Sequence, residues 1–271
     1  MAKLLKEANR IITLWRKYGP GGDKIDLESV FNEVVLPASS GDSCEIKYDE
    51  FDAFEGLMAR EGNARKWVIG INKGIPYAPR RNFTLAHEIG HFIGHRYKRQ
   101  DFQCSFEDLN DFQDEILEKE ANDFAAHLLM PPDIIRKFDS ERIFSHEVVV
   151  ELAERQGVSR AAAAYRWVGL SNRRVGFVIS RDGFFTQGRA SEKAYKEGVF
   201  FRQGDEVPSR SVVTSLSVTG RRSCTSVDGG VWHPNSGCHE TSYVATVGDY
   251  IYTYLDFDQS EMCSERSAAP Q

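Results

Sequence analysis

Three histidines stand at four-residue intervals in the segment TLAHEIGHFIGH, and the residues around them are of types that bind metal ions. His87 and His91 are four residues apart, so on a helix both rings lie on one face and can bind the same ion. Glu88 follows His87 directly and projects from the adjacent side, where its carboxylate can take a proton from a water bound to that ion. This H-E-x-x-H pattern predicts a metal-dependent hydrolytic site.

His95 is the third histidine of the series, but its position on a helix argues against a role as a ligand. His87 and His95 are eight residues apart, about 12 Å along a straight helix, whereas a zinc–nitrogen bond is about 2 Å long. In the extended motif H-E-x-x-H-x-x-G-x-x-H the third histidine would fall on residue 97, which is Tyr97. We therefore interpret His95 as a helix-end residue or an outer partner of the site.

A further ligand is expected from the segment EKEANDFAAHLLMPP, which predicts a second helix. Glu118 can complete a His-His-Glu set that leaves a fourth position for water. Asn122, one turn further along, can hydrogen-bond a ligand histidine and fix its tautomer. Glu115 and Glu120 are alternatives that lie off this face. The helix would pack on the histidine helix through an apolar stripe in which small Ala121 permits close approach; the stripe comprises Ala121, Phe124, Ala125 and Leu128.

Two blocks, RRNFTLAHEIGHFIGH and EKEANDFAAHLLMP, resemble in order the ImmA/IrrE family of zinc metallopeptidases. The resemblance implies a zincin-like, gluzincin-type domain with one zinc ion. It also implies a separate helix-turn-helix repressor as substrate, whose cleavage would derepress stress or defence genes. The family's ligands, catalytic glutamate and Glu-x-x-Ala-Asn helix fall on His87, Glu88, His91, Glu118 and Asn122.

Cys104 lies between the two predicted metal-binding helices, in RQDFQCSFED. A thiolate is a good zinc ligand, so a loop over residues 98–106 that folds over the site would let Cys104 take the position of the water. The alternative is a partly buried cysteine without a metal. The chain also resembles the CapP branch of the family, found beside anti-phage CBASS genes, and this implies such a cysteine lock and activation by single-stranded DNA.

The elements that must position these residues form an α+β arrangement. A hairpin is expected over residues 54–74, and its second strand, KWVIGIN, is a candidate edge for an extended substrate. After Ser171 the chain becomes β-rich, with strands expected in RRVGFVIS, DGFFTQ and SVVTSLSV and a hairpin in SYVATVGDYIYTYLDF. Helices are expected at residues 3–18, 26–35 with Asp26 as N-cap, about 84–95, 107–130, 145–156 and 159–169.

These patterns predict a peptidase domain over residues 1–170, a second domain over 171–262 and a flexible tail over 263–271. Proteins of the IrrE type carry a GAF-like C-terminal domain, and the resemblance implies a GAF-like α/β sensor here. The helices at 145–169 also resemble a helix-turn-helix. The predicted recognition helix offers mainly alanines, so packing against the peptidase domain is the preferred interpretation.

The span from Val158 to Arg222 holds twelve Lys and Arg against five Asp and Glu, although the whole chain has a net charge of −6. Aromatic residues interleave with these charges, as in proteins that hold single-stranded nucleic acid without reading its sequence. Most of these aromatics can instead be core residues. The candidate phosphate contacts are Arg173, Arg174, Arg221 and Arg222.

Composition bounds the remaining possibilities. Five scattered cysteines in 271 residues do not indicate a disulfide scaffold, and no apolar run approaches a membrane span, so a soluble cytoplasmic protein is expected. The resemblance to the ImmA/IrrE family implies a bacterial source. A competing hypothesis is a nucleic-acid or small-ligand sensor whose metal site is only structural. A second metal site is a weaker hypothesis, with core or redox-sensitive thiols as its alternative; its candidates are Cys224, His233, Cys238, His239 and Cys263.

Overall fold

The computed structural model describes residues 2–52, 54–62, 65–98, 101–104, 112–216, 221–245 and 248–259. The chain divides into two compact units. The first unit comprises residues 1–131 and 153–159, and the second comprises 132–152 and 160–271. Helix α6 (His146–Gln156) therefore contributes residues to both units. The domain boundary that the change in sequence texture predicts near residue 170 stays a prediction.

The first unit contains a four-stranded sheet in the order β1-β3-β2-β4. The expected hairpin is confirmed, because β2 (Gly56–Arg60) pairs antiparallel with β3 (Lys66–Asn72). The expectation that β3 is an edge strand is wrong, since β1 (Ser43–Asp49) pairs with it in parallel on its other side. The expected loop over residues 98–106 is also wrong in part. Asp101–Cys104 form β4, which pairs antiparallel with β2 and lies at the end of this sheet.

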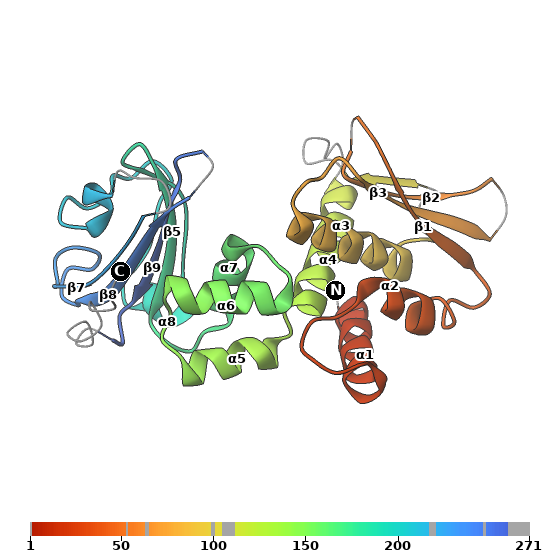
Figure 1. Cartoon of the computed structure of the whole chain (residues 1–271), viewed down its shortest axis with the longest axis horizontal. Coiled ribbons are helices and arrows are strands. Elements are labelled where there is room, and N and C mark those ends of the chain that lie inside the picture. The colour runs from red at the N-terminus through yellow and green to blue at the C-terminus, as the bar shows by residue number, and fades with distance from the viewer. Residues whose placement is uncertain are drawn as a thin grey trace, which may run out of the picture. The chain divides into compact units, whose positions relative to one another are not determined.

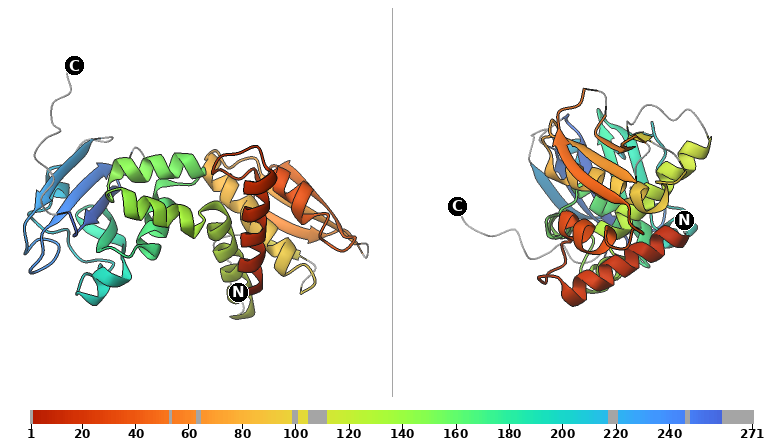
Figure 2. Two further views of the ribbon diagram at one scale, coloured as in Figure 1. Left: turned by 90° about the horizontal axis from the view of Figure 1, so that it is seen from below. Right: turned by 90° about the vertical axis from the view of Figure 1, so that its right-hand side faces the viewer.

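Five helical segments within residues 2–131 accompany this sheet (Figures 1 and 2). The N-terminal helix α1 spans Ala2–Tyr18 and packs on α4. Asp26 caps α2 (Leu27–Val30) as expected, because its carboxylate accepts a hydrogen bond from the Ser29 amide. The chain continues into a π-helical segment over Phe31–Val35. The two long helices α3 (Ala78–Gly94) and α4 (Phe112–Leu129) lie side by side.

The close approach of α3 and α4 depends on small residues. A Cβ atom placed on Gly90 of α3 would lie 3.0 Å from Cδ1 of Phe124 and 3.4 Å from Cα of Ala121, both on α4. Ala121, Phe124, Ala125 and Leu128 are all fully buried, so the expected apolar stripe is confirmed. Gly90 has no side chain and Ala121 has only a methyl group, so the two helix backbones can approach closely at this point.

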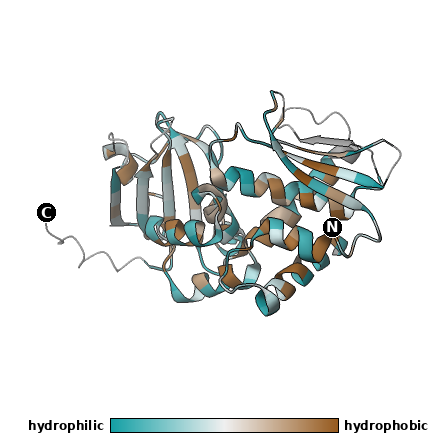
Figure 3. Cartoon of the chain, turned by 45° about the vertical axis from the view of Figure 1, so that its right-hand side comes forward, coloured by the Kyte–Doolittle hydropathy of each residue, from teal (hydrophilic) through white to brown (hydrophobic). Residues whose placement is uncertain are grey.

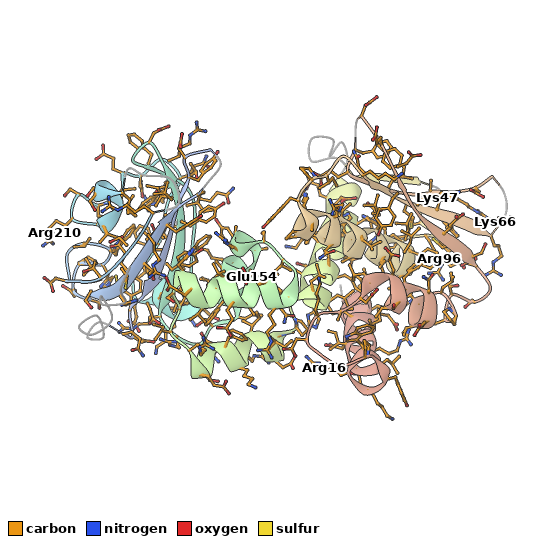
Figure 4. All side chains as sticks on the ribbon, viewed as in Figure 1. Arg16, Lys47, Lys66, Arg96, Glu154 and Arg210 are labelled. Carbon is orange, nitrogen blue, oxygen red and sulfur yellow. The ribbon has the colours of Figure 1, made fainter. Side chains whose placement is uncertain are left out.

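A buried carboxylate anchors the C-terminal end of α3. Asp42 accepts hydrogen bonds from Nε of Arg65 at 2.8 Å, from Nε of Arg96 at 2.8 Å and from the hydroxyl of Tyr97. Figure 4 labels Arg96 just beyond α3. Burial alone would raise the pKa of Asp42, but the hydrogen bonds from Tyr97, Arg96 and Arg65 lower it to about 2. The carboxylate of Asp42 therefore links three segments: the residues before β1, the β2–β3 hairpin and the C-terminal end of α3.

The second unit contains a five-stranded antiparallel sheet in the order β6-β5-β9-β8-β7. Figure 3 shows both hydrophobic and hydrophilic residues in this sheet. The inner strand β5 is buried along nearly its whole length, whereas exposed and partly exposed residues alternate along the edge strand β7. One face packs on Val199, Val207 and Val213 from the connecting segments. The strands are β5 (Val175–Arg181), β6 (Phe184–Ala190), β7 (Arg222–Val227), β8 (Cys238–Val244) and β9 (Ile251–Asp256).

The helices of the second unit only partly follow the sequence pattern. The two prolines predict the end of α4 but give no indication of the helix α5 (Pro132–Glu141) that follows them. The prediction of a strand in SVVTSLSV is wrong, because Val212–Ser215 form a 3₁₀ helix. The short helix α8 spans Glu192–Lys196.

The helix α7 (Arg160–Leu170) settles the packing of the helix-turn-helix-like segment. Its residues Ala163, Ala164 and Trp167 are fully buried, and α7 contacts β5 and β6 of the same unit. The Trp167 indole donates a 2.8 Å hydrogen bond to buried Asp139 of α5. The prediction that this helix is buried is therefore confirmed. The prediction that it packs against the peptidase domain is wrong, because its partners are the sheet and α5 of the second unit. None of the helices in the described ranges has the length and apolar character that crossing a bilayer requires.

Candidate metal centre

Three side chains from α3 and α4 converge in the first unit. Nε2 of His87 lies 2.9 Å from Nε2 of His91. The two oxygens of Glu118 lie 3.1 Å from Nε2 of His87 and 3.2 Å from Nε2 of His91. Among the described residues this is the one group of three or more ligand-type side chains close enough to share an ion.

The donor set fits zinc. Two imidazole nitrogens and a carboxylate oxygen are a common zinc ligand set, and four-coordinate bonds of about 2.0–2.1 Å hold donor atoms roughly 3.3 Å apart. The separations between the three residues are close to that value. His91 is fully buried and His87 nearly so, so the donors face one another in a site largely shielded from solvent.

Glu118 and His91 have protonation states that suit a cation, whereas His87 has to lose its proton when an ion binds. Burial lowers the pKa of His91 to about 4, against the opposing hydrogen bond to Glu118, so the ring is neutral at pH 7 and offers a lone pair. Burial would also lower the pKa of His87, but its hydrogen bond to Glu118 and the nearby charge of Glu88 raise it. Burial would raise the pKa of Glu118, and hydrogen bonds with the two histidines instead hold it well below its usual range.

Each ligand histidine has a partner on its other ring nitrogen. Nδ1 of His87 lies 3.0 Å from the side-chain oxygen of Asn122, so the structure brings this pair together as expected. Nδ1 of His91 lies 2.9 Å from Nδ1 of His95. His95 is also the residue that caps α3. The interpretation of His95 as a helix-end and outer residue therefore agrees with its position.

Glu88 lies on the side of α3 that faces β2, and its side chain is fully buried. A Cβ atom at Gly56 of β2 would lie 2.6 Å from Oε1 of Glu88 and 2.6 Å from Cγ2 of Thr84. The strand thus leaves room for the carboxylate only because residue 56 has no side chain. Gly56 carries no chemical group that would mark it as a site residue, and its one signal in the sequence is its place inside a strand, where a glycine often indicates a close approach.

We expect Gly56→Ala to displace the Glu88 carboxylate while leaving the three donors in place. A misplacement of about 1 Å at a reacting group can cost roughly 100-fold in rate, and we expect a loss of that order in peptide cleavage with unchanged zinc content. Zinc analysis and cleavage rates of the variant measure both quantities. Thr84→Ser in the Gly56→Ala background removes only the contact with Cγ2, so a full recovery would show that Glu88 is not the group displaced.

Cys104 is placed by its backbone alone, because its side chain lies outside the described residues. It ends β4 and pairs with Gly56 across the β2–β4 register. The main chain of Cys104 is therefore opposite the strand position that contacts Glu88. Whether its sulfur reaches the donors stays a prediction.

These arrangements agree with the comparisons to known proteins. Residues 43–168 match the model of the IrrE N-terminal-like domain, Peptidase_M78. The match indicates a metallopeptidase and supports the resemblance to the ImmA/IrrE family. It covers β1 through most of α7 and includes His87, Glu88, His91 and Glu118. Nothing in the match bears on the CapP branch, which stays a prediction.

Of the other two comparisons, one finds no match and the other finds a similar fold. None of the curated proteins matches the chain. Among solved structures, the fold is similar to that of a Mycobacterium tuberculosis transcriptional regulator, with a TM-score of 0.57 and 13% sequence identity. The alignment covers 94% of this chain and 77% of that chain. At this identity the likeness concerns the fold alone.

The candidate nucleic-acid residues of the second unit have partners within that unit. Arg173 bonds buried Asp256 at 2.5 Å, Arg174 bonds Asp258 and Glu197, and Arg222 bonds Glu147. Arg221 is exposed. Phe177 and Phe185 are core residues, as the alternative interpretation expected. The exposed aromatics of the same basic span are Phe184, Tyr195 and Phe200.

The second metal site is not assembled among the described residues. Sγ of Cys224 lies 3.4 Å from Nε2 of His239, but Cys238 belongs to the apolar core. His233 instead lies 2.9 Å from the carbonyl oxygen of Glu197. Cys263 is outside the described part of the chain. The hypothesis is wrong for the described candidates, because neighbouring strand residues 238 and 239 point to opposite faces.

Proposed function

We propose that this protein is a zinc-dependent endopeptidase that cleaves a separate helix-turn-helix transcriptional repressor. The observation that carries the proposal is the convergence of His87, His91 and Glu118 next to a buried carboxylate, Glu88. A purely structural metal site has no need of that carboxylate. The match to the IrrE N-terminal-like domain supports the same activity.

The chain's own residues have distinct parts in this chemistry. Zinc held by the three donors would polarise the scissile carbonyl and lower the pKa of a water molecule to about 7. Glu88 accepts the proton of the attacking water and returns it to the leaving nitrogen. Asn122 orients His87 through Nδ1. The outer edge of β4 is a candidate for pairing with an extended substrate, because β4 lies at the end of the sheet on the side of Gly56.

A repressor as substrate is supported by the family resemblance, which the match to the IrrE N-terminal-like domain strengthens. The test is incubation with a candidate helix-turn-helix repressor from the same organism, for wild type and Glu88→Gln, with and without single-stranded DNA. Cleavage that requires Glu88 supports the proposal. If the repressor remains intact under every condition while an unrelated repressor is also uncut, the proposed substrate class is wrong.

We further propose that the protein acts in the bacterial cytoplasm and is latent until a stress signal, such as single-stranded DNA from DNA damage, reaches a GAF-like sensor over residues 171–262. The described cysteines Cys44, Cys224 and Cys238 are not in disulfides, which fits a reducing compartment. The antiparallel sheet of the second unit and its exposed aromatics Phe184, Tyr195 and Phe200 support a binding role. The CapP branch and the CBASS context belong to this proposal.

Cys104 is the proposed lock of the latent form, and Cys104→Ser should raise basal cleavage about tenfold or more, since a hydroxyl is a much weaker zinc ligand than a thiolate. The pairing of Cys104 with Gly56, beside Glu88, supports this position. The measurement is the rate of repressor cleavage without DNA. Cys44→Ser is the matched control, because Cys44 is an unpaired cysteine of the same unit that lies on β1. Equal basal cleavage rates for Cys104→Ser and wild type would show that Cys104 does not inhibit the enzyme.

The second candidate function is a nucleic-acid or small-ligand sensor with a structural metal. The basic span supports it, whereas the internal partners of Arg173, Arg174 and Arg222 weaken it. It predicts salt-dependent binding of single strands with no cleavage of any repressor.

A further inference from the structure

We infer that His95 and Glu120 form a hydrogen-bonded relay that fixes the tautomer and orientation of His91 as a metal ligand. The inference rests on the proposed zinc site and assigns to the third histidine a positioning role. Neither the H-E-x-x-H pattern nor the three-donor set requires such a partner, so the relay is a separate feature of this chain.

The relay is continuous and buried at its centre. Nδ1 of His91 lies 2.9 Å from Nδ1 of His95, and Nε2 of His95 lies 3.1 Å from a carboxylate oxygen of Glu120. Both histidine side chains are fully buried, and Glu120 is 18% exposed. The His91 and His95 rings meet edge to face, with centroids 5.0 Å apart. Each distance is within the range of a direct hydrogen bond.

Only one arrangement of protons satisfies this chain while both rings are neutral. The Glu120 carboxylate is an acceptor, so Nε2 of His95 must donate to it. Nδ1 of His95 is then an acceptor, and Nδ1 of His91 must donate to it. Nε2 of His91 is left with a lone pair, and this is the atom that faces Glu118 and His87. The carboxylate thus determines, through one intervening ring, which nitrogen of His91 faces the metal.

The two ligand histidines therefore have different supports. His87 is oriented directly by the neutral amide of Asn122. His91 is oriented by an imidazole that is itself held by a carboxylate from the same helix, α4, that supplies Glu118. The helical spacing explains how this is possible, because His87, His91 and His95 lie one turn apart along one side of α3. The position that excludes His95 as a ligand is the position that lets it hold His91.

The test is zinc affinity of the apo protein, measured by competition with a chromophoric chelator, for wild type, His95→Leu, His95→Asn and Glu120→Gln. Loss of an outer hydrogen-bond partner typically weakens metal binding by about 10–100-fold. We expect that loss for His95→Leu. We expect His95→Asn to regain most of the affinity, because its side-chain oxygen can accept from Nδ1 of His91. Glu120→Gln should show an intermediate loss of zinc affinity. This variant keeps the buried His95 ring, so it should fold as wild type does.

Lys98→Ala is the control, since Lys98 lies 4.0 Å from Glu120 and is largely exposed, and it should bind zinc as wild type does. Thermal unfolding of the apo variants separates a loss of fold from a loss of affinity. If His95→Leu and His95→Asn bind zinc equally, whether strongly or weakly, the relay is wrong while the three-donor site stands. If wild type itself binds no zinc, the proposed function fails together with the relay.

Discussion

Replacement of Glu88 by Gln is expected to abolish most peptide cleavage while zinc content stays at the wild-type level. A positioned general base contributes about 10²–10⁴-fold to a rate, and glutamine has the same shape but cannot accept the proton of the attacking water. The side chain is fully buried and packs against Gly56 of β2, so an isosteric change should not disturb the helix. The measurements are the repressor cleavage rate and the zinc content of the same preparations.

The control is Glu115→Gln, because Glu115 is an exposed carboxylate on α4 and was an alternative to Glu118 as a ligand. Its cleavage rate should equal that of wild type. A Glu88→Gln variant that retains full activity and zinc would rule out Glu88 as the proton acceptor. Loss of zinc together with activity would instead indicate that the carboxylate supports the metal site.

Replacement of Glu118 by Ala is expected to remove zinc and, with it, all zinc-dependent cleavage. Glu118 supplies both oxygens that face the two histidines, at 3.1 and 3.2 Å. Two neutral imidazoles remain, so the affinity should fall by more than the roughly 100-fold that the loss of an outer partner costs. Chelator competition measures the affinity. Glu115→Ala provides the matched substitution on the same helix.

The variant also tests the charge balance of the site. In the apo protein, the hydrogen bond to Glu118 helps to raise the pKa of His87, and this contribution disappears with the carboxylate. NMR titration of the histidines should therefore show a lower His87 pKa in Glu118→Ala than in the apo wild type. Retention of tight zinc binding by this variant would mean that another residue completes the donor set.

The local part of the site could be predicted from the sequence because its geometry is helical. The spacing of His87 and His91, and of Glu118 and Asn122, specifies which side chains share a face. The stripe around Ala121 indicates which helices pack together. The same regularity excluded His95 as a ligand, and the structure places that ring against His91.

The parts that were wrong depend on contacts between distant residues. Strand order is not encoded in local patterns, so the sequence does not reveal that β1 pairs with β3, and the prediction of β3 as an edge strand is wrong. Residues 101–104 form a strand only because β2 offers a partner. The importance of Gly56 follows from the approach of another element, α3. A residue without a side chain gives no chemical signal of its own, and its position in a strand was the one available indication.

The contact between Gly90 and Ala121 also has a consequence for ion selectivity. The histidines come from α3 and the carboxylate from α4, so the distance between the two helices determines how far the histidine nitrogens lie from the carboxylate oxygens. Because the two helix backbones are in close contact there, the donor atoms on α3 and α4 stay close together, and moving them apart would break this packing. Donor atoms held close together suit ions with bonds near 2.0–2.1 Å and disfavour Ca²⁺, whose bonds are 2.3–2.6 Å and whose ligands are more numerous. We therefore expect the site to bind zinc in preference to Ca²⁺, with the close helix packing at Gly90 as the physical reason.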